Sequence, residues 1–238
     1  MPPVYDAARA AGYDAHIRRI SPGYEVLHDH IAGLLLGALE PEAHILVVGA
    51  GTGAEVERLG RAAPGWRFTA VDPSPDMLAV CRQRAEAAGM ADRVAYVEGT
   101  TEAAPDGPFD AATSVCVAHF LLDPEARVHY FQAIADRLGP GAPFVHADLF
   151  RPTGDPEAIE RLITVWRRAV RQAGMSDPEA DAFFDRVGRM VHLADEATLD
   201  REATATGFGQ RTRFHQSLVW GAWIATRHPE VGRSEEAR

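Results

Sequence analysis

The chain has 238 residues, a normal length for one α/β domain that carries an insertion. Its formal net charge of −10 disfavours a general nucleic-acid-binding protein, because an acidic surface repels phosphate backbones. No apolar run reaches the roughly 18 residues of a membrane span, and the N-terminus has no long apolar core, so we expect a cytoplasmic protein. The absence of Lys separately excludes Schiff-base and Walker-type lysine chemistry.

Residues 1–40 predict a helical arm ahead of the main domain. Helical spacing of apolar residues extends from Val4 to Leu39, and the segment Ser21-Pro22-Gly23 interrupts it. We therefore expect two helices separated by a turn.

Residues 41–150 alternate short apolar runs with amphipathic segments. The expected strands are His44–Val48, Arg67–Val71, Val94–Val97, Phe109–Cys116 and Pro143–Leu149, and the expected helices are Ala54–Ala63, Pro75–Ala88 and Pro124–Leu138. This order is typical of a parallel sheet with helices on both faces.

The rest of the chain predicts an insertion and a return to the sheet. Residues 151–194 hold the Arg-rich helical segment Asp155–Met190, interrupted near Gly174–Pro178, which we interpret as a helical lid. Residues 195–226 predict a helix over Asp195–Thr206, with Asp195 as N-cap, and an antiparallel pair of strands over Arg211–Ser217 and Leu218–Thr226. Residues 227–238 are expected to form a polar tail.

A glycine-rich turn joins the first expected strand to its helix. In Ile45–Gly53, the residues Gly49, Ala50, Gly51 and Gly53 let the backbone turn sharply and approach a ligand closely. The same pattern also fits a dinucleotide-binding fingerprint. Asp72, followed by Pro73, ends the second strand, where a carboxylate can accept both hydroxyls of an adenosine ribose. These residues alone do not separate NAD from S-adenosyl-L-methionine (SAM).

Later motifs separate the two cofactors. Glu98-Gly99-Thr100-Thr101, Phe109-Asp110, His119-Phe120-Leu121 and Leu138-Gly139-Pro140-Gly141 follow in an order that resembles class I SAM-dependent methyltransferases. The resemblance implies a Rossmann-like, seven-stranded, mostly parallel sheet with an antiparallel C-terminal hairpin and a helical lid insertion. It also implies that the loop at Gly49–Gly53 holds the methionine part of SAM, Asp72 with Pro73 the ribose, and Thr100 and Thr101 the adenine. Val47 and Thr100 depart from the family, which usually has an acidic residue at the first position and often Asp at the second.

A narrower resemblance involves both ends of the chain. The segments Arg18–Tyr24, Arg213–Gln216 and Val219–Ala222 are similar to the carboxy-SAM synthase branch, which acts in tRNA wobble-uridine modification. That resemblance implies that Tyr24 approaches the methionine end of SAM. Val115, a candidate cofactor-binding residue, stands where that branch has an Asn, and Glu202 stands where it has the Arg that holds the extra carboxylate. We therefore expect a relative of that enzyme with a different activity.

Acid–base candidates lie at the ends of the fourth and fifth strands. His119 follows the fourth, and His146 and Asp148 lie two residues apart on the fifth, so their side chains share a face. We take His119 and Asp148 as candidate catalytic residues. The alternatives are that His119 only packs beside the cofactor and that His146 is a buried, hydrogen-bonded histidine. Cys81 and Cys116 lack metal spacing, and we expect no metal site.

The function favoured by these patterns is methyl transfer from SAM to an O, N or C nucleophile of a small-molecule acceptor. The alternatives are a carboxy-SAM synthase-like enzyme and a non-catalytic SAM-binding protein. An NAD dehydrogenase is disfavoured, since the Tyr-x-x-x-Lys dyad is absent. We expect no nucleic-acid or membrane partner and suggest a homodimer.

Overall fold

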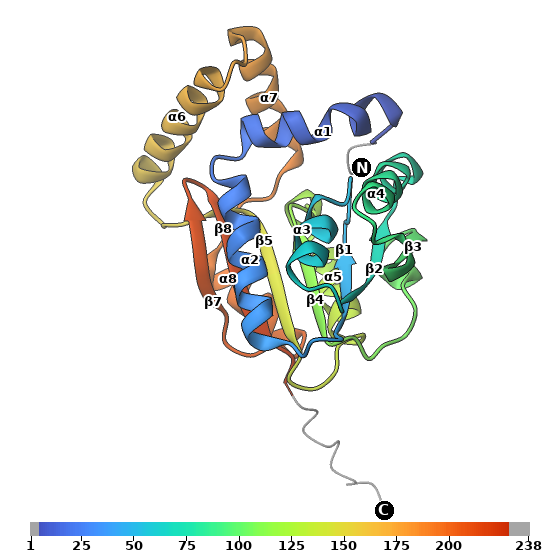
Figure 1. Ribbon diagram of the computed structural model, residues 1–238. Coiled ribbons are helices and arrows are strands. Elements are labelled where there is room, and N and C mark those ends of the chain that lie inside the picture. Colours follow the sequence, from blue (N-terminus) through green and yellow to red (C-terminus); the bar gives the residue numbers. More distant parts are fainter. Residues whose placement is uncertain (1–4, 229–238) are drawn as a thin grey trace, which may run out of the picture.

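The computed structural model describes residues 5–228 and has a single mixed β-sheet (Figure 1). Its main path runs in the order β3-β2-β1-β4-β5-β8-β7. The strands are β1 His44–Val48, β2 Arg67–Asp72, β3 Val94–Glu98, β4 Ala111–Val115, β5 Pro143–Arg151, β6 Ala194–Asp195, β7 Thr212–Ser217 and β8 Trp220–Thr226. The five strands β1–β5 are parallel along this path, and β8 runs antiparallel to both of its neighbours. The predicted seven-stranded, mostly parallel sheet is confirmed. The two-residue strand β6, which pairs with β5, was not predicted.

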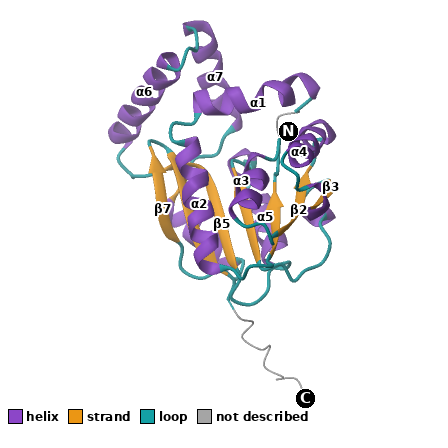
Figure 2. Cartoon of the chain, viewed as in Figure 1, coloured by secondary structure: helices purple, strands orange, loops and turns teal. Residues whose placement is uncertain are grey.

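Helices cover the sheet on both faces (Figure 2). The α-helices are α1 Ala7–Ile20, α2 Tyr24–Ala38, α3 Ala54–Ala62, α4 Pro75–Ala87, α5 Pro124–Ala135, α6 Pro156–Gln172, α7 Asp177–Met190 and α8 Glu196–Ala205. One apolar core lies between the sheet and α2, α3 and α4, and another lies between the sheet and α5 and α8. Strands β1, β2 and β5 are buried on both faces, as their continuous apolar sequences predict, whereas β3 at the edge of the sheet is only partly buried.

A third apolar cluster lies outside the sheet layers, where α1, α6 and α7 meet beyond the carboxyl ends of the parallel strands (Figure 1). Trp166 of α6 is fully buried there and packs edge-on against Phe183, Phe184 and Trp220. Its Nε1 donates a hydrogen bond to the Ile20 carbonyl over 2.6 Å. These contacts join the inserted helices to the N-terminal arm. Whether α6 and α7 act as a lid stays a prediction, as do the domain boundaries.

Several element ends differ from the prediction. Strand β4 begins at Ala111, since Phe109 instead forms an isolated bridge with Leu138, and β5 continues to Arg151 because β6 pairs with its end. The predicted N-cap Asp195 is confirmed, because its side chain accepts a hydrogen bond from Thr198 N. Arg227, the first residue of the expected tail, is anchored to α5, because its side chain donates to the Ala135 carbonyl. Val4 and residues 229–238 lie outside the described residues.

Two observations bear on membranes and metals. Within residues 5–228, no helix has the length and apolar character needed to cross a membrane. The same residues hold no group of His, Cys, Asp and Glu side chains arranged to bind a metal ion.

Candidate active site

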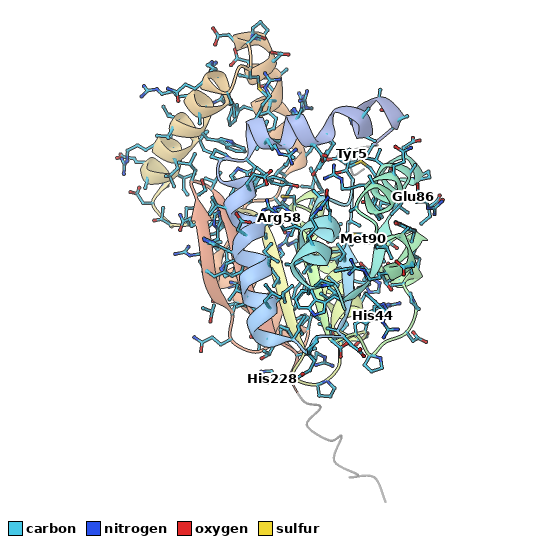
Figure 3. The ribbon with its side chains drawn as sticks, viewed as in Figure 1. Tyr5, His44, Arg58, Glu86, Met90 and His228 are labelled. Atoms are coloured by element: carbon cyan, nitrogen blue, oxygen red, sulfur yellow. The ribbon has the colours of Figure 1, made fainter. Side chains whose placement is uncertain are left out.

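The glycine loop leaves β1 at the end of the sheet that α1 covers. Tyr5 lies at this end, and His44, where β1 begins, lies at the other (Figure 3). Gly49 and Gly51 have φ angles of 69° and 53°, in the left-handed region that favours glycine. A Cβ on Gly49 would approach Val117 Cγ2 to 2.3 Å, so this position accepts no side chain. The absence of a side chain at Gly49 thus allows the loop backbone to pack closely against Val117, just after β4.

Asp72 connects the glycine loop to the start of α4. Its Oδ2 accepts a hydrogen bond from Gly51 N and its Oδ1 from Ser74 N, each over 2.9 Å. Burial raises the pKa of this carboxyl, and the two N–H donors oppose that shift. Each oxygen keeps a lone pair, so a carboxylate at this position can also accept hydroxyl groups from a ribose. Pro73, also predicted to contact the cofactor, is exposed beside it.

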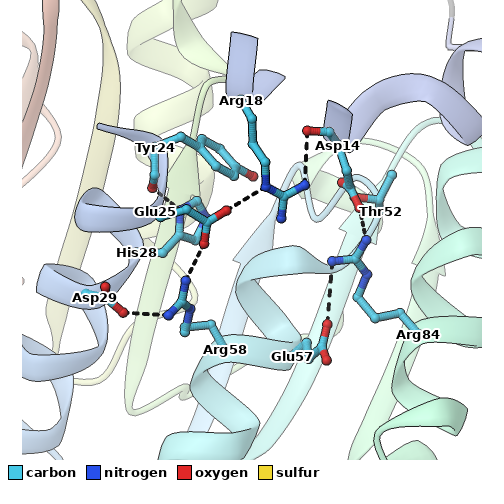
Figure 4. Close-up of polar contacts among 10 residues, drawn as sticks. All are labelled: Asp14, Arg18, Tyr24, Glu25, His28, Asp29, Thr52, Glu57, Arg58 and Arg84. Atoms are coloured by element: carbon cyan, nitrogen blue, oxygen red, sulfur yellow. Dashed lines mark hydrogen bonds and ion pairs between the residues drawn. The ribbon is translucent and has the colours of Figure 1, made fainter. Parts of the chain in front are cut away.

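Helix α1 covers the glycine loop through polar contacts (Figure 4). Asp14 accepts a hydrogen bond from Thr52 Oγ1 over 2.6 Å and forms an ion pair with Arg84 of α4. Ser74 Oγ donates to the Tyr5 carbonyl over 2.5 Å, which anchors the segment ahead of α1. Sequence reasoning missed Asp14, since no local pattern links it to a loop 38 residues further along the chain.

A cavity of about 690 Å³ lies beneath α1 and α7, within the size range of small-molecule sites. Aromatic and aliphatic side chains line most of it, no carboxylate does, and its cations are Arg9 and Arg186. Cys116, whose φ of 63° is unusual for a residue other than glycine, forms part of the wall at the end of β4. Val115 is partly buried and packs against the core beneath α2 and α3, and its contact with the cofactor stays a prediction.

The two predicted catalytic residues lie side by side, and one of them, His119, lines this cavity. His119, in the short helix η3 (Ala118–Phe120), lines the wall, and its Nδ1 forms a hydrogen bond with Asp148 Oδ1. Asp148 Oδ2 bonds in turn to His146 Nε2, and all three side chains are buried. Burial alone would raise the pKa of Asp148, but the two imidazoles outweigh it and hold that pKa well below the usual range. His146 does not line the cavity, in agreement with a buried, hydrogen-bonded histidine.

The remaining predicted cofactor residues lie around the same end of the sheet. Thr101 is almost fully buried, and its Oγ1 has no hydrogen-bond partner among the described residues. Thr100 Oγ1 instead donates to Glu102 over 2.5 Å. Tyr24 is buried at the start of α2, stacked at a tilt on His28. Thr101 therefore offers a free polar atom where the adenine was expected, and Thr100 does not.

Residues 45–141 match the family model described as a methyltransferase domain. Over 222 residues, the chain is 27% identical to the carboxy-S-adenosyl-L-methionine synthase of Aeromonas salmonicida, covering 90% of this chain and 87% of that one. These matches support a place for the chain in the class I SAM-dependent methyltransferase family, and with it SAM as the cofactor.

Other relatives agree with this family. The chain is 28% identical to a ubiquinone/menaquinone biosynthesis C-methyltransferase of Bradyrhizobium diazoefficiens, over 71% of this chain and 81% of that protein. A solved O-methyltransferase family 2 protein from Planctomyces limnophilus, in complex with apigenin, has the same fold, with a TM-score of 0.60 and 16% identity. The structural match covers 93% of this chain and 68% of the Planctomyces limnophilus chain. The chain spans only 26% of a Synechococcus protein to which it is 35% identical.

The residues present fit SAM at the glycine loop. The adenosine would be held by Asp72 and by the free hydroxyl of Thr101, and the methionine part by the loop itself. The buried Oε1 of Glu55, just after the loop, also has no partner within residues 5–228. Polar atoms buried without partners are uncommon in folded proteins, and a polar ligand at the glycine loop would give both of these atoms a partner.

Glu202 occupies the position where the carboxy-SAM synthase branch has an Arg, and its surroundings are those of a buried ion pair. Glu202 of α8 is buried and forms a two-pronged ion pair with Arg127 of α5, at 2.8 and 2.9 Å. Arg201 is exposed and bonds to Thr198. Neither Glu202 nor Arg201 lines the cavity, and Arg127 neutralises the charge of Glu202 away from it.

Replacing Asp72 with Ala is expected to weaken the binding of S-adenosylhomocysteine by about 1–3 kcal/mol, because charge-assisted hydrogen bonds to the ribose are lost. Titration calorimetry of the purified variant measures the change. The matched control is Asp76→Ala in the first turn of α4, which removes a carboxylate close by without touching the loop. Equal affinities for wild type and a folded Asp72→Ala variant would place the ribose elsewhere.

Proposed function

We propose that the protein transfers the methyl group of SAM to a hydroxyl oxygen of a small acceptor bound in the 690 Å³ cavity. The proposal depends on one observation, the buried hydrogen bond between His119 and Asp148 in the cavity wall. A hydroxyl is a weak nucleophile until it loses its proton. A site for a hydroxyl acceptor therefore needs a positioned base, which a site for a more reactive nucleophile does not need.

The protonation of this group follows from its hydrogen bonds. Asp148 contacts one nitrogen of each of two imidazoles, and an ionised carboxylate only accepts hydrogen bonds. His119 Nδ1 and His146 Nε2 must therefore both donate to it. In neutral His119 this leaves Nε2 as the proton acceptor, and that atom has no hydrogen-bond partner among the described residues.

The chemistry divides between the cofactor and these side chains. SAM, when bound, supplies a methyl carbon activated by its sulfonium, so that an O–C bond forms as the S–C bond breaks. His119 Nε2 takes the proton that the hydroxyl loses, and Asp148 stabilises the resulting imidazolium. The apolar wall excludes water and fixes the direction from which the acceptor approaches the methyl group. Such orientation can lower the activation free energy by several kcal/mol.

A second candidate, carboxy-SAM synthesis, is favoured by the 27% identity to the Aeromonas salmonicida enzyme over most of both chains. That chemistry needs a cation near the sulfonium, since an unpaired carboxylate in a partly dry pocket is costly. No cation of α8 lines the cavity, and the two that do, Arg9 and Arg186, are exposed residues of α1 and α7. These observations favour methyl transfer.

The two reactions can be distinguished in one experiment. The protein is incubated with SAM and a panel of phenols and aliphatic alcohols, and in parallel with SAM and prephenate. We expect S-adenosylhomocysteine together with an acceptor that gains one methyl group, and no carboxy-SAM with prephenate. Mass spectrometry of the nucleotide and acceptor products measures both outcomes.

The panel also separates the remaining possibilities. Carboxy-SAM formation from prephenate would replace this proposal with synthase activity. Methylation of amines or carbon acids in preference to every hydroxyl acceptor would contradict the role of a base at His119. A protein that binds SAM but turns over no acceptor of any class would favour a non-catalytic SAM-binding protein.

A further inference from the structure

Glu55 is a buried carboxyl that the proposed chemistry leaves without a role. It is the second residue of α3, two positions after Gly53, and is only 6% exposed. Its Oε1 has no hydrogen-bond partner, and none of the described cations forms an ion pair with it. Because burying a carboxylate without a partner is costly, its presence calls for a ligand that compensates the charge.

A second polar atom without a partner lies beside it. Burial raises the pKa of Glu55 to about 7, and the nearby hydroxyl of Thr113 in β4 opposes this shift. Thr113 is itself fully buried, and its Oγ1 has no partner of normal hydrogen-bond geometry. Thr113 is paired with Val47 of β1, so both oxygens lie over the junction of β1 and β4, directly beneath the glycine loop.

The electrostatic influence of Glu55 extends toward the cavity. Burial raises the pKa of Tyr24 and that of Cys116, and the Glu55 charge adds to both shifts. Cys116 lines the cavity and Tyr24 begins α2, so the Glu55 carboxyl is near enough to influence a side chain of the cavity wall. This is the region expected to hold the methionine part of SAM.

We propose that Glu55, with Thr113, binds the ammonium group of the methionine part of SAM. The proposal rests on the proposed use of SAM and adds a residue to its binding site. An ammonium has three donors and a positive charge, which match a carboxylate and a hydroxyl that both lack partners. In this chain the strand position where the family usually has an acidic residue is the apolar Val47, and the carboxylate comes instead from the neighbouring helix.

The test compares two ligands that differ in the methionine part. Glu55→Gln keeps the size of the side chain and removes its charge. Calorimetry with S-adenosylhomocysteine, which carries the ammonium, is expected to show binding about 10- to 100-fold weaker than wild type. Binding of 5′-methylthioadenosine, which lacks the ammonium, is expected to be unchanged. The control is Glu57→Gln, two residues further along α3, which removes a partly exposed carboxylate paired with Arg61.

A stability measurement separates binding from a structural role. Without ligand, Glu55→Gln is expected to unfold at the same temperature as wild type or a higher one, because a buried, unpaired charge has been removed. Equal weakening of both ligands, or no weakening of either, would overturn the proposal while leaving the proposed function in place. If the wild type binds neither ligand, the proposed function fails first and this inference fails with it.

Discussion

Replacing His119 with Asn is expected to lower kcat for a hydroxyl acceptor by about 10²- to 10⁴-fold, the usual contribution of a general base. Asn preserves a polar side chain of similar width but cannot take a proton. The Kd for S-adenosylhomocysteine is expected to stay close to the wild-type value, because His119 lines the cavity proposed for the acceptor, which no residue of the glycine loop lines. Steady-state kinetics and calorimetry measure the two quantities separately.

The choice of acceptor makes this result specific to proton removal. The loss caused by His119→Asn is expected to shrink as the acceptor hydroxyl becomes more acidic, since an acceptor that is already ionised needs no base. His16→Asn is the matched control, because His16 lines the same cavity and has no carboxylate hydrogen-bonded to its ring. A loss that is equally large for every acceptor would indicate that His119 only maintains the shape of the cavity.

The buried ion pair between Arg127 and Glu202 predicts the largest effect on stability. Arg127→Met leaves Glu202 buried and unpaired, which is expected to reduce the free energy of unfolding by about 3–5 kcal/mol. The same guanidinium donates to the Ala118 carbonyl over 2.6 Å, so its loss also frees η3, the short helix that holds His119. Urea denaturation measures the stability change.

Two further variants test the cause of that loss. The double variant Arg127→Met with Glu202→Leu removes both charges and is expected to recover most of the stability. Arg61→Met breaks an exposed pair with Glu57 at 2.8 Å and is expected to reduce stability by less than about 1 kcal/mol. A loss of similar size in Arg127→Met and in Arg61→Met would show that the buried pair contributes little.

Much of the cofactor end could be predicted because its signals are local. A strand, a turn that needs positive φ at Gly49 and Gly51, and a helix follow one another without interruption. Asp72 was predicted for a similar reason, since in parallel sheets the end of each strand lies at the same edge. The alternation of apolar strands and amphipathic helices predicted the sheet and its two covering layers.

Other parts depended on contacts between distant residues. His119 and Asp148 are 29 positions apart, and the sequence placed both near strand ends without showing that they share a hydrogen bond. No local sequence pattern indicates that α1 covers the glycine loop through Asp14, or that Glu202 pairs with Arg127. Glu55 was missed because an acidic residue in the first turn of a helix is ordinary, and only its burial makes it notable.

The sequence by itself determined the order of elements, the glycine loop, the carboxylate at the end of β2 and the resemblance to a family that the comparisons support. These depend on backbone sterics and on the periodicity of apolar residues, which act over a few neighbouring positions. The tertiary structure alone decided which charges are neutralised, which imidazole faces the cavity and which buried oxygens lack a partner. Those properties arise from desolvation and from pairing across separate elements, and they exist only once the chain is packed.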